Sequence, residues 1–282
     1  MTVEALHCVP GSLLGRAASG DVTAFGELAG IWASNTAAGK VNYAEGIVAT
    51  GFWQRLASAT GDGNALLELA EVLLAHGTFA ARHDREARAI WLGAEAIRRL
   101  EQSADVGVEA AVARLVQVGP LLRPESLLVA NQWREDPIAS ELSDFDRVFR
   151  DAAGGSVAAV SEIYQNALAD VEQENIGVLE GLVLLEATAR LGAASGDLDS
   201  ACRLGKVLIR RASFDRSCGV DDPACTREGE CLSILTSLAA ADSDEAVSLL
   251  AQAVEEFLPR ASILSAIADG RILASLPPKG NC

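Results

Sequence analysis

The chain has 282 residues, half of them hydrophobic but only 5% aromatic, and its formal net charge is −16. This length is enough for one large core or two ordinary domains, and an apolar content carried mainly by alanine and leucine favours closely packed helices over strands. The acidity argues against nucleic acid as the main partner, because binding phosphates needs clustered Lys and Arg.

The first residues, MTVEALHCVPGSLL, contain neither a basic leader nor an apolar stretch long enough for a signal peptide. No run of about 18 uninterrupted apolar residues occurs, and the most apolar stretch is interrupted by Glu180 and Glu186. The sequence therefore predicts a cytoplasmic protein with no membrane partner. A short helix is expected near residues 11–18.

The pentapeptide AASGD occurs at residues 17–21 and again at 193–197, and its glycine marks a recurring joint. Related markers follow one another at steps of 41, 46, 48, 41 and 46 residues, with Asp242 in place of the last glycine. The six markers are Gly20, Gly61, Gly107, Gly155, Gly196 and Asp242. A period in the forties is typical of an array of paired helices.

The residues that follow each marker repeat as columns. Four positions on, every residue is small, and eight positions on, every residue is aliphatic; the position five on is apolar in all six copies. Such spacing forms one face of a helix. The glycine is expected to end one helix in the left-handed conformation, and the next helix is expected to be capped by Asp21, Asp62, Ser156 or Asp197.

Each repeat is predicted to hold two helices, here called its first and second helix. First helices are expected at 21–34, 62–76, 106–118, 156–171, 197–213 and 243–257, and second helices at 41–59, 84–103, 137–153, 174–194, 226–241 and 260–275. The repeats are predicted at 20–60, 61–106, 107–154, 155–195, 196–241 and 242–276, within a single domain spanning 1–282 that ends in a tail, 277–282. An insertion in the third repeat is expected to add a short helix.

Residues 52–77 resemble the Sel-one-like repeat, a relative of the tetratricopeptide repeat. The family pattern is Trp, then Ala, Gly, Ala and Leu at intervals of four, and it is matched by Trp53, Ala57, Gly61, Ala65 and Leu69. Later repeats keep the glycine, alanine and leucine positions and lose the tryptophan. The resemblance implies an all-α fold, a right-handed α-solenoid of about six helical pairs that presents a concave groove to another protein.

The histidines show no catalytic spacing. His76 and His83 lie seven residues apart without an HExxH pattern, and Gly77 is expected to break the helix between them, which favours a polar loop over a metal or phosphohydrolase site. The four tryptophans are interpreted as packing between helices rather than as ligand-stacking residues.

Cys218, Cys225 and Cys231 lie in what is expected to be an inter-helix loop, with no CxxC pair. Free thiols in a reducing cytoplasm are the first interpretation. The alternatives are a disulfide between Cys218 and Cys231, or a zinc site that would need Cys202 as its fourth ligand.

No phosphate-binding loop, nucleophile elbow or dinucleotide fingerprint occurs, so neither an enzyme nor a cofactor is expected. The predicted function is a scaffold or adaptor that binds another protein or peptide. One alternative is a stoichiometric inhibitor or immunity-type protein whose acidic surface masks a basic site; another is an enzyme with an unrecognised pocket.

If the tetratricopeptide relation holds, positions three and ten after each marker line the concave wall. They carry amide and charged groups suited to holding a peptide backbone or basic side chains, although an ordinary solvated helix face is the alternative. The predicted partner-binding residues are Asn64, Glu71, Gln117, Gln165, Asp199, Lys206, Glu245 and Gln252.

Overall fold

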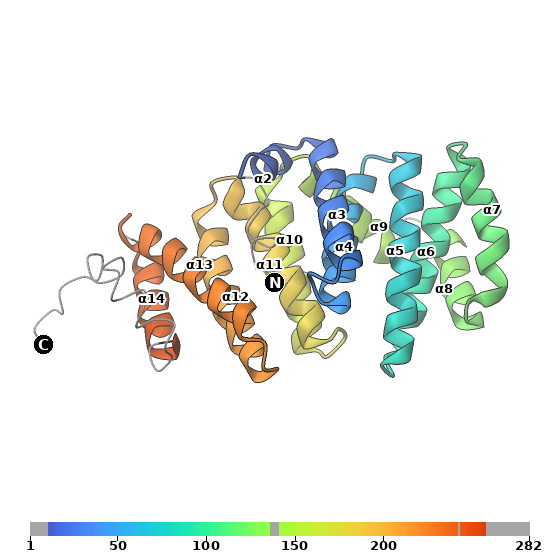
Figure 1. Ribbon diagram of the computed structural model, residues 1–282. Helices are drawn as coiled ribbons and strands as arrows, with labels where there is room; N and C mark the ends of the chain where they lie inside the picture. Colours follow the sequence, from blue (N-terminus) through green and yellow to red (C-terminus); the bar gives the residue numbers. More distant parts are fainter. Residues whose placement is uncertain (1–10, 136–140, 242, 258–282) are drawn as a thin grey trace, which may run out of the picture. The chain divides into compact units, whose positions relative to one another are not determined.

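A computed structural model describes residues 11–135, 141–241 and 243–257 (Figure 1). Within these ranges all regular structure is helical, which confirms the all-α class. The helices are α2 (Gly11–Ala18), α3 (Val22–Ala37), α4 (Tyr43–Ser58), α5 (Gly63–Arg82), α6 (Glu86–Asp105), α7 (Glu109–Val118), the 3-10 turn η1 (Gly119–Leu121), α8 (Pro124–Glu135), α9 (Glu141–Ala153), α10 (Val157–Glu172), α11 (Val178–Ala194), α12 (Leu198–Ser217), α13 (Asp221–Ala239) and α14 (Asp244–Phe257).

The glycine markers stand at helix joints, as predicted. All five marker glycines have φ between 83° and 93°: Gly20, Gly61, Gly107, Gly155 and Gly196. Glycine takes up this left-handed conformation at little steric cost, whereas other residues are strained in it. The sixth marker, Asp242, lies outside the described residues.

The predicted caps are confirmed. Asp62 accepts a hydrogen bond from the backbone N–H of Ala65 at 2.8 Å, and Asp197 accepts one from Ser200 at 2.9 Å. Asp21 and Ser156 cap α3 and α10 in the same way. Each bond satisfies an N–H that the helix leaves without a partner, and such a cap stabilises a helix by about 1 kcal/mol.

The buried columns are confirmed with two exceptions. The small residues four positions after the markers are buried, apart from the half-buried Ala65, and so are the aliphatic residues eight positions after them, apart from Leu115. Five positions on, however, Val112 is 52% exposed and Val247 is 38% exposed. The prediction of burial is wrong for these two valines, because the neighbours of α7 and α14 cover the opposite side of each helix.

Several helix boundaries differ from the prediction. Helix α5 continues through Gly77 to Arg82, because Gly77 is buried against α6, where an added Cβ would lie 3.5 Å from the carbonyl oxygen of Ala89. Helix α13 begins at Asp221, five residues earlier than predicted, so Cys225 and Cys231 lie on a helix rather than in a loop. The insertion forms α8, as expected, while the predicted helix 260–275 lies outside the described residues.

The chain folds into two compact units, residues 1–195 and 196–282. The single domain and the continuous solenoid remain predictions. In the second unit, helices α12, α13 and α14 pack on one another through buried aliphatic and aromatic side chains, among them Leu208, Leu235, Leu250 and Phe257.

In the first unit the packing order differs from the chain order. Helices α3 to α8 form successive neighbours, and then α9, α10 and α11 return to pack against α2, α3 and α4. One core joins these six helices, with Phe25, Phe52, Trp53, Phe149 and Ile163 at its centre. The first repeat therefore contacts the second on one side and the fourth on the other.

The two halves of the chain repeat each other with a fixed displacement. The starts of α3, α4, α5, α6 and α7 recur 135 residues later as the starts of α10, α11, α12, α13 and α14. Unusual backbone positions recur as well: Gly39 and Glu174 both have positive φ, and so do Asp84 and Gly219. The structure thus contains two copies of one five-helix arrangement.

Individual contacts recur between the two copies. An added Cβ on Gly46 would overlap the side chain of Thr36, and one on Gly181 would overlap Val171, which is the counterpart of Thr36. Each glycine follows a buried glutamate, Glu45 or Glu180. The Glu–Gly pair is therefore a packing element that lets the second helix of a repeat approach the first closely.

Among the helices in the described ranges, none combines the length and the hydropathy that crossing a membrane requires.

Candidate functional site

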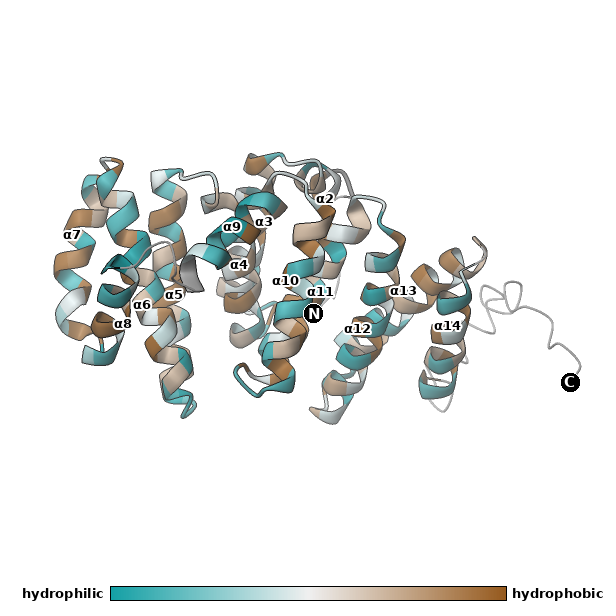
Figure 2. Ribbon diagram, turned by 180° about the vertical axis from the view of Figure 1, so that it is seen from behind, coloured by the Kyte–Doolittle hydropathy of each residue, from teal (hydrophilic) through white to brown (hydrophobic). Residues whose placement is uncertain are grey.

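The predicted partner-binding residues lie on the first helices, as expected. Asn64 and Glu71 are on α5, Gln117 on α7 and Gln165 on α10; in the second unit, Asp199 and Lys206 are on α12 and Glu245 and Gln252 on α14. Glu71 is half-buried, and the other seven residues are exposed. We call these eight residues the polar stripe, and Figure 2 shows hydrophilic residues beside hydrophobic ones along these helices.

The structure brings some stripe residues together. In the first unit, Arg114 of α7 donates hydrogen bonds to Glu71 at 2.8 Å and to Gln117 at 3.3 Å. In the second unit, Lys206 donates to Glu245 at 2.6 Å. These contacts join the first helices of consecutive repeats. Within the described residues, no hydrogen bond links Asn64 or Gln165 to another stripe residue.

The histidine prediction is wrong for His76. This residue lies within α5 rather than in a loop and is buried, with its Nε2 3.5 Å from Glu180 of α11. Glu180 also accepts a hydrogen bond from Arg88 at 2.6 Å. Burial lowers the pKa of His76 to about 4, which Glu180 opposes only in part. For Glu180, burial raises the pKa, but Arg88 and His76 outweigh it and leave the pKa below its usual value.

A second buried ionic group links α4, α6 and α9. Arg55 donates two hydrogen bonds to Glu95, at 3.2 and 2.7 Å, and Arg99 contacts both Glu95 and Asp146. Burial opposes the charge on Glu95, but Arg55 and Arg99 overcome this and hold its pKa below the ordinary value. Removing one member would leave a buried charge without its partner, which typically costs about 3–5 kcal/mol.

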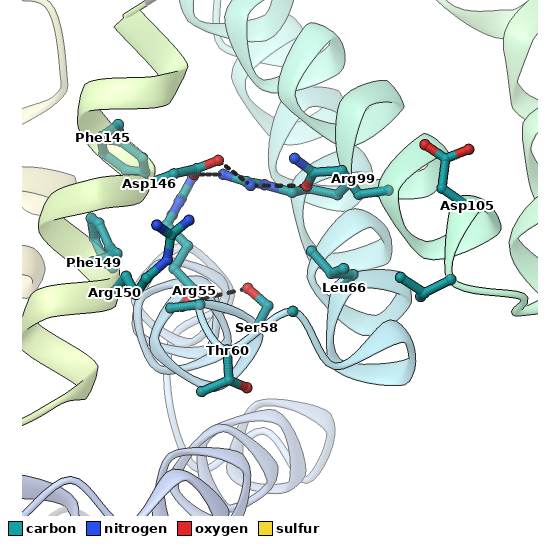
Figure 3. Close-up of a pocket in the computed structure, with 14 residues that line it drawn as sticks. Arg55, Ser58, Thr60, Leu66, Arg99, Asp105, Phe145, Asp146, Phe149 and Arg150 are labelled. Atoms are coloured by element: carbon teal, nitrogen blue, oxygen red, sulfur yellow. Dashed lines mark hydrogen bonds and ion pairs between the residues drawn. The ribbon is translucent and has the colours of Figure 1, made fainter. Parts of the chain in front are cut away.

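Beside this ionic group lies a pocket of about 350 Å³, which we call the arginine pocket (Figure 3). Its lining comes from the carboxyl end of α4, the joint at Gly61, α6 and α9. Arg55, Arg99 and Arg150 contribute guanidinium groups, while Phe145 and Phe149 contribute aromatic rings. Arg55 lies over the ring of Phe145, 5.5 Å from its centroid, a favourable cation–π arrangement.

The second copy of the fold does not repeat this pocket. Arg55 and Glu95 have identical counterparts 135 residues later, Arg190 and Glu230. In contrast, Arg99 corresponds to Ile234, and Arg150 corresponds to Gly15 in the helix that precedes the first repeat. The Arg–Glu pair thus belongs to the shared framework, and the remaining charged groups are specific to the arginine pocket.

Sequence analysis does not single out these arginines. Arg55 carries the one usable signal, because it is the only charged residue in the otherwise apolar stretch GIVATGFWQRLAS. Arg99 and Arg150 come from ordinary charged helix faces, and only the folded arrangement places them together.

Cys202, Cys218, Cys225 and Cys231 are free thiols. Cys231 is buried and contacts the carbonyl oxygen of Gly205 at 3.5 Å, and burial raises its pKa to about 12. Cys225 accepts a hydrogen bond from Arg216 at 3.3 Å. The disulfide considered between Cys218 and Cys231 is not formed. Among the described His, Cys, Asp and Glu side chains, no three are gathered where they could hold a metal ion.

The chain matches no known family model, no curated protein and no solved structure. The resemblance of residues 52–77 to the Sel-one-like repeat is neither supported nor contradicted by these comparisons.

Proposed function

We propose that this protein binds a segment of another protein along the polar stripe, as a scaffold or adaptor. In this proposal the repeats continue as a superhelix, and the stripe lies on its concave wall. The observation that carries the proposal is the exposure of the stripe: on each first helix, neighbouring columns are buried, yet Asn64, Gln165 and Gln252 remain exposed. Folding alone does not require these side chains.

The composition of the stripe fits a polypeptide ligand. Amides both donate and accept hydrogen bonds, so Asn64, Gln117 and Gln165 are suited to the backbone of an extended segment. The pairs Arg114–Glu71 and Lys206–Glu245 connect neighbouring first helices, so their charged groups are held in fixed places. A partner would therefore meet groups that are already positioned, which lowers the entropic cost of binding.

Partner capture from native cell extract, followed by mass spectrometry, tests this function. The variant Asn64→Ala/Glu71→Ala/Gln165→Ala is compared with Glu125→Ala/Gln132→Ala/Asn166→Ala, which removes the same kinds of group from exposed positions outside the stripe. We expect the first variant to lose partners that the second retains, with the melting temperature nearly unchanged in both. Equal capture by both variants would refute binding along the stripe.

A further inference from the structure

The arginine pocket places cationic groups together in an acidic protein. Arg55, Arg99 and Arg150 line it, together with the carboxylates of Asp105 and Asp146. Glu95 lies behind the pocket and pairs with both Arg55 and Arg99. These opposite charges nearly neutralise the two buried arginines, so Arg150 decides what the open side of the pocket attracts.

Arg150 differs from the other arginine on the exposed side of α9. Arg147, one turn earlier, is close to Asp144, Asp151 and Glu162. The guanidinium of Arg150 makes no hydrogen bond or ion pair with any described residue, although it lines the pocket. In addition, the Nε of Arg99, which is buried, has no hydrogen-bond partner in the described structure. Two arginines of the pocket therefore retain unused donors.

The rest of the lining is apolar or weakly polar. Phe145, Phe149 and Leu66 form apolar walls, and the hydroxyl of Thr60 lies at the joint between α4 and α5 (Figure 3). A volume of about 350 Å³ is at the small end of ligand pockets. Such a space suits a short hydrocarbon stem that ends in one charged group.

We propose that the arginine pocket binds a single carboxylate on a short apolar stem. One unpaired guanidinium matches one negative charge and can bind a carboxylate through two parallel N–H···O bonds. A dianionic phosphate would bring a second charge next to Asp105 and Asp146. The carboxylate comes either from a glutamate side chain of a partner protein or from a small carboxylic acid. None of the lining residues belongs to the polar stripe, so this inference does not rest on the proposed function.

The two copies of the fold provide an internal comparison. Arg99 and Arg150 are replaced by Ile234 and Gly15 at the corresponding positions of the other copy, while the framework residue Arg55 is retained as Arg190. A purely structural role in the repeat would call for these arginines in both copies. Their presence in one copy points to a role confined to this pocket.

The test is a ¹H–¹⁵N NMR titration of the full chain with four probes. Pentanoate and N-acetylglutamate N-methylamide carry the carboxylate, while pentanamide and N-acetylglutamine N-methylamide are their uncharged counterparts. We expect each carboxylate that binds to shift the amide signals of Thr60, Gly61 and Arg99 and its amide counterpart to leave them unmoved. Saturation by the glutamate probe identifies a partner's side chain as the ligand, and saturation by pentanoate alone identifies a small acid. Shifts with neither carboxylate, or equal shifts with the amides, would overturn the proposal.

Two variants locate the binding. Arg150→Ala removes the unpaired guanidinium at an exposed position, and we expect roughly tenfold weaker carboxylate binding or more, as for the loss of a charge-assisted hydrogen bond. Arg147→Ala, the matched control on the same helix, should bind as the native protein does. Unchanged affinity in Arg150→Ala, with a native melting temperature, would contradict the proposal.

Discussion

Gly20 and Gly155 meet where the first and fourth repeats of the chain contact each other. An added Cβ on Gly20 would lie 3.3 Å from the carbonyl oxygen of Ala153, and one on Gly155 would lie 3.4 Å from that of Ala18. The contact is reciprocal, since each joint packs on the residues that precede the other. It brings the two copies of the fold together through equivalent residues.

The first prediction separates the conformational role of these glycines from their packing role. Gly20→Ala and Gly155→Ala each place a Cβ at positive φ and also crowd a backbone carbonyl, so each should lower the free energy of unfolding by about 2 kcal/mol. Gly61→Ala and Gly196→Ala are the controls, because they share the positive φ but have open space around them. They should cost about 1 kcal/mol in urea unfolding. Equal losses at all four positions would show that the contact between the joints contributes nothing.

The second prediction concerns the close approach of helices at Gly181. Gly181→Ala should lower the free energy of unfolding by about 1–3 kcal/mol, because the new methyl group overlaps Val171. Val171→Ala makes room for that methyl group, so the double variant should lose less than the two single variants together. Strictly additive losses in this double-mutant cycle would mean that the two residues do not interact.

The third prediction concerns acid. His76 has a native pKa of about 4, below its ordinary value of 6.5 because of burial, so the unfolded chain takes up a proton at higher pH than the native protein. Its contribution to stability is complete above pH 6.5 and falls as the pH drops toward 4, by about 2 kcal/mol at pH 5. Glu95 and Glu180, whose pKa values are lowered, add losses in the same direction at more acidic pH.

Urea unfolding of native protein and His76→Gln at pH 7.5 and pH 5 measures this effect. The variant should be less stable at neutral pH but should lose less stability between the two values. The same pH dependence in both proteins would assign it to groups other than His76.

The fourth prediction concerns thiol reactivity in the native state. Cys218 is exposed and should be alkylated first, followed by Cys225, which is half-buried beside Arg216. Cys231 should remain unmodified until the protein unfolds, because it is buried and its pKa is raised to about 12, which leaves almost no thiolate. Mass spectrometry of timed alkylation gives the order, and rapid modification of Cys231 would contradict the packing of α13.

The parts of the fold that sequence reasoning predicts well are local. A glycine at positive φ followed by a capping Asp62 or Asp197 leaves a signal within a few residues, so the joints and most first helices are predicted correctly. Gly77 shows the limit of local reasoning. A glycine inside a helix reads as a break, but here a neighbouring helix occupies the space that its missing side chain leaves.

Long-range relations are not predictable in this way. Arg99 and Asp146 are 47 residues apart, and Arg88 and Glu180 are 92 residues apart, with no motif to connect them. The displacement of 135 residues between the two copies is visible in pairs such as Glu45–Gly46 and Glu180–Gly181. A repeat period in the forties hides it, because each repeat resembles every other one weakly.

Binding of a partner protein along the polar stripe is the central claim, and site-specific photocrosslinking tests it most directly. A photoreactive amino acid is placed at Asn64 or Gln165 within the stripe, and at Gln132 or Asn166 as exposed controls. The proposal predicts that Asn64 and Gln165 crosslink to one and the same partner in native extract and that the two control positions do not. Crosslinks to that partner only from Gln132 or Asn166, or from all four positions alike, would contradict it.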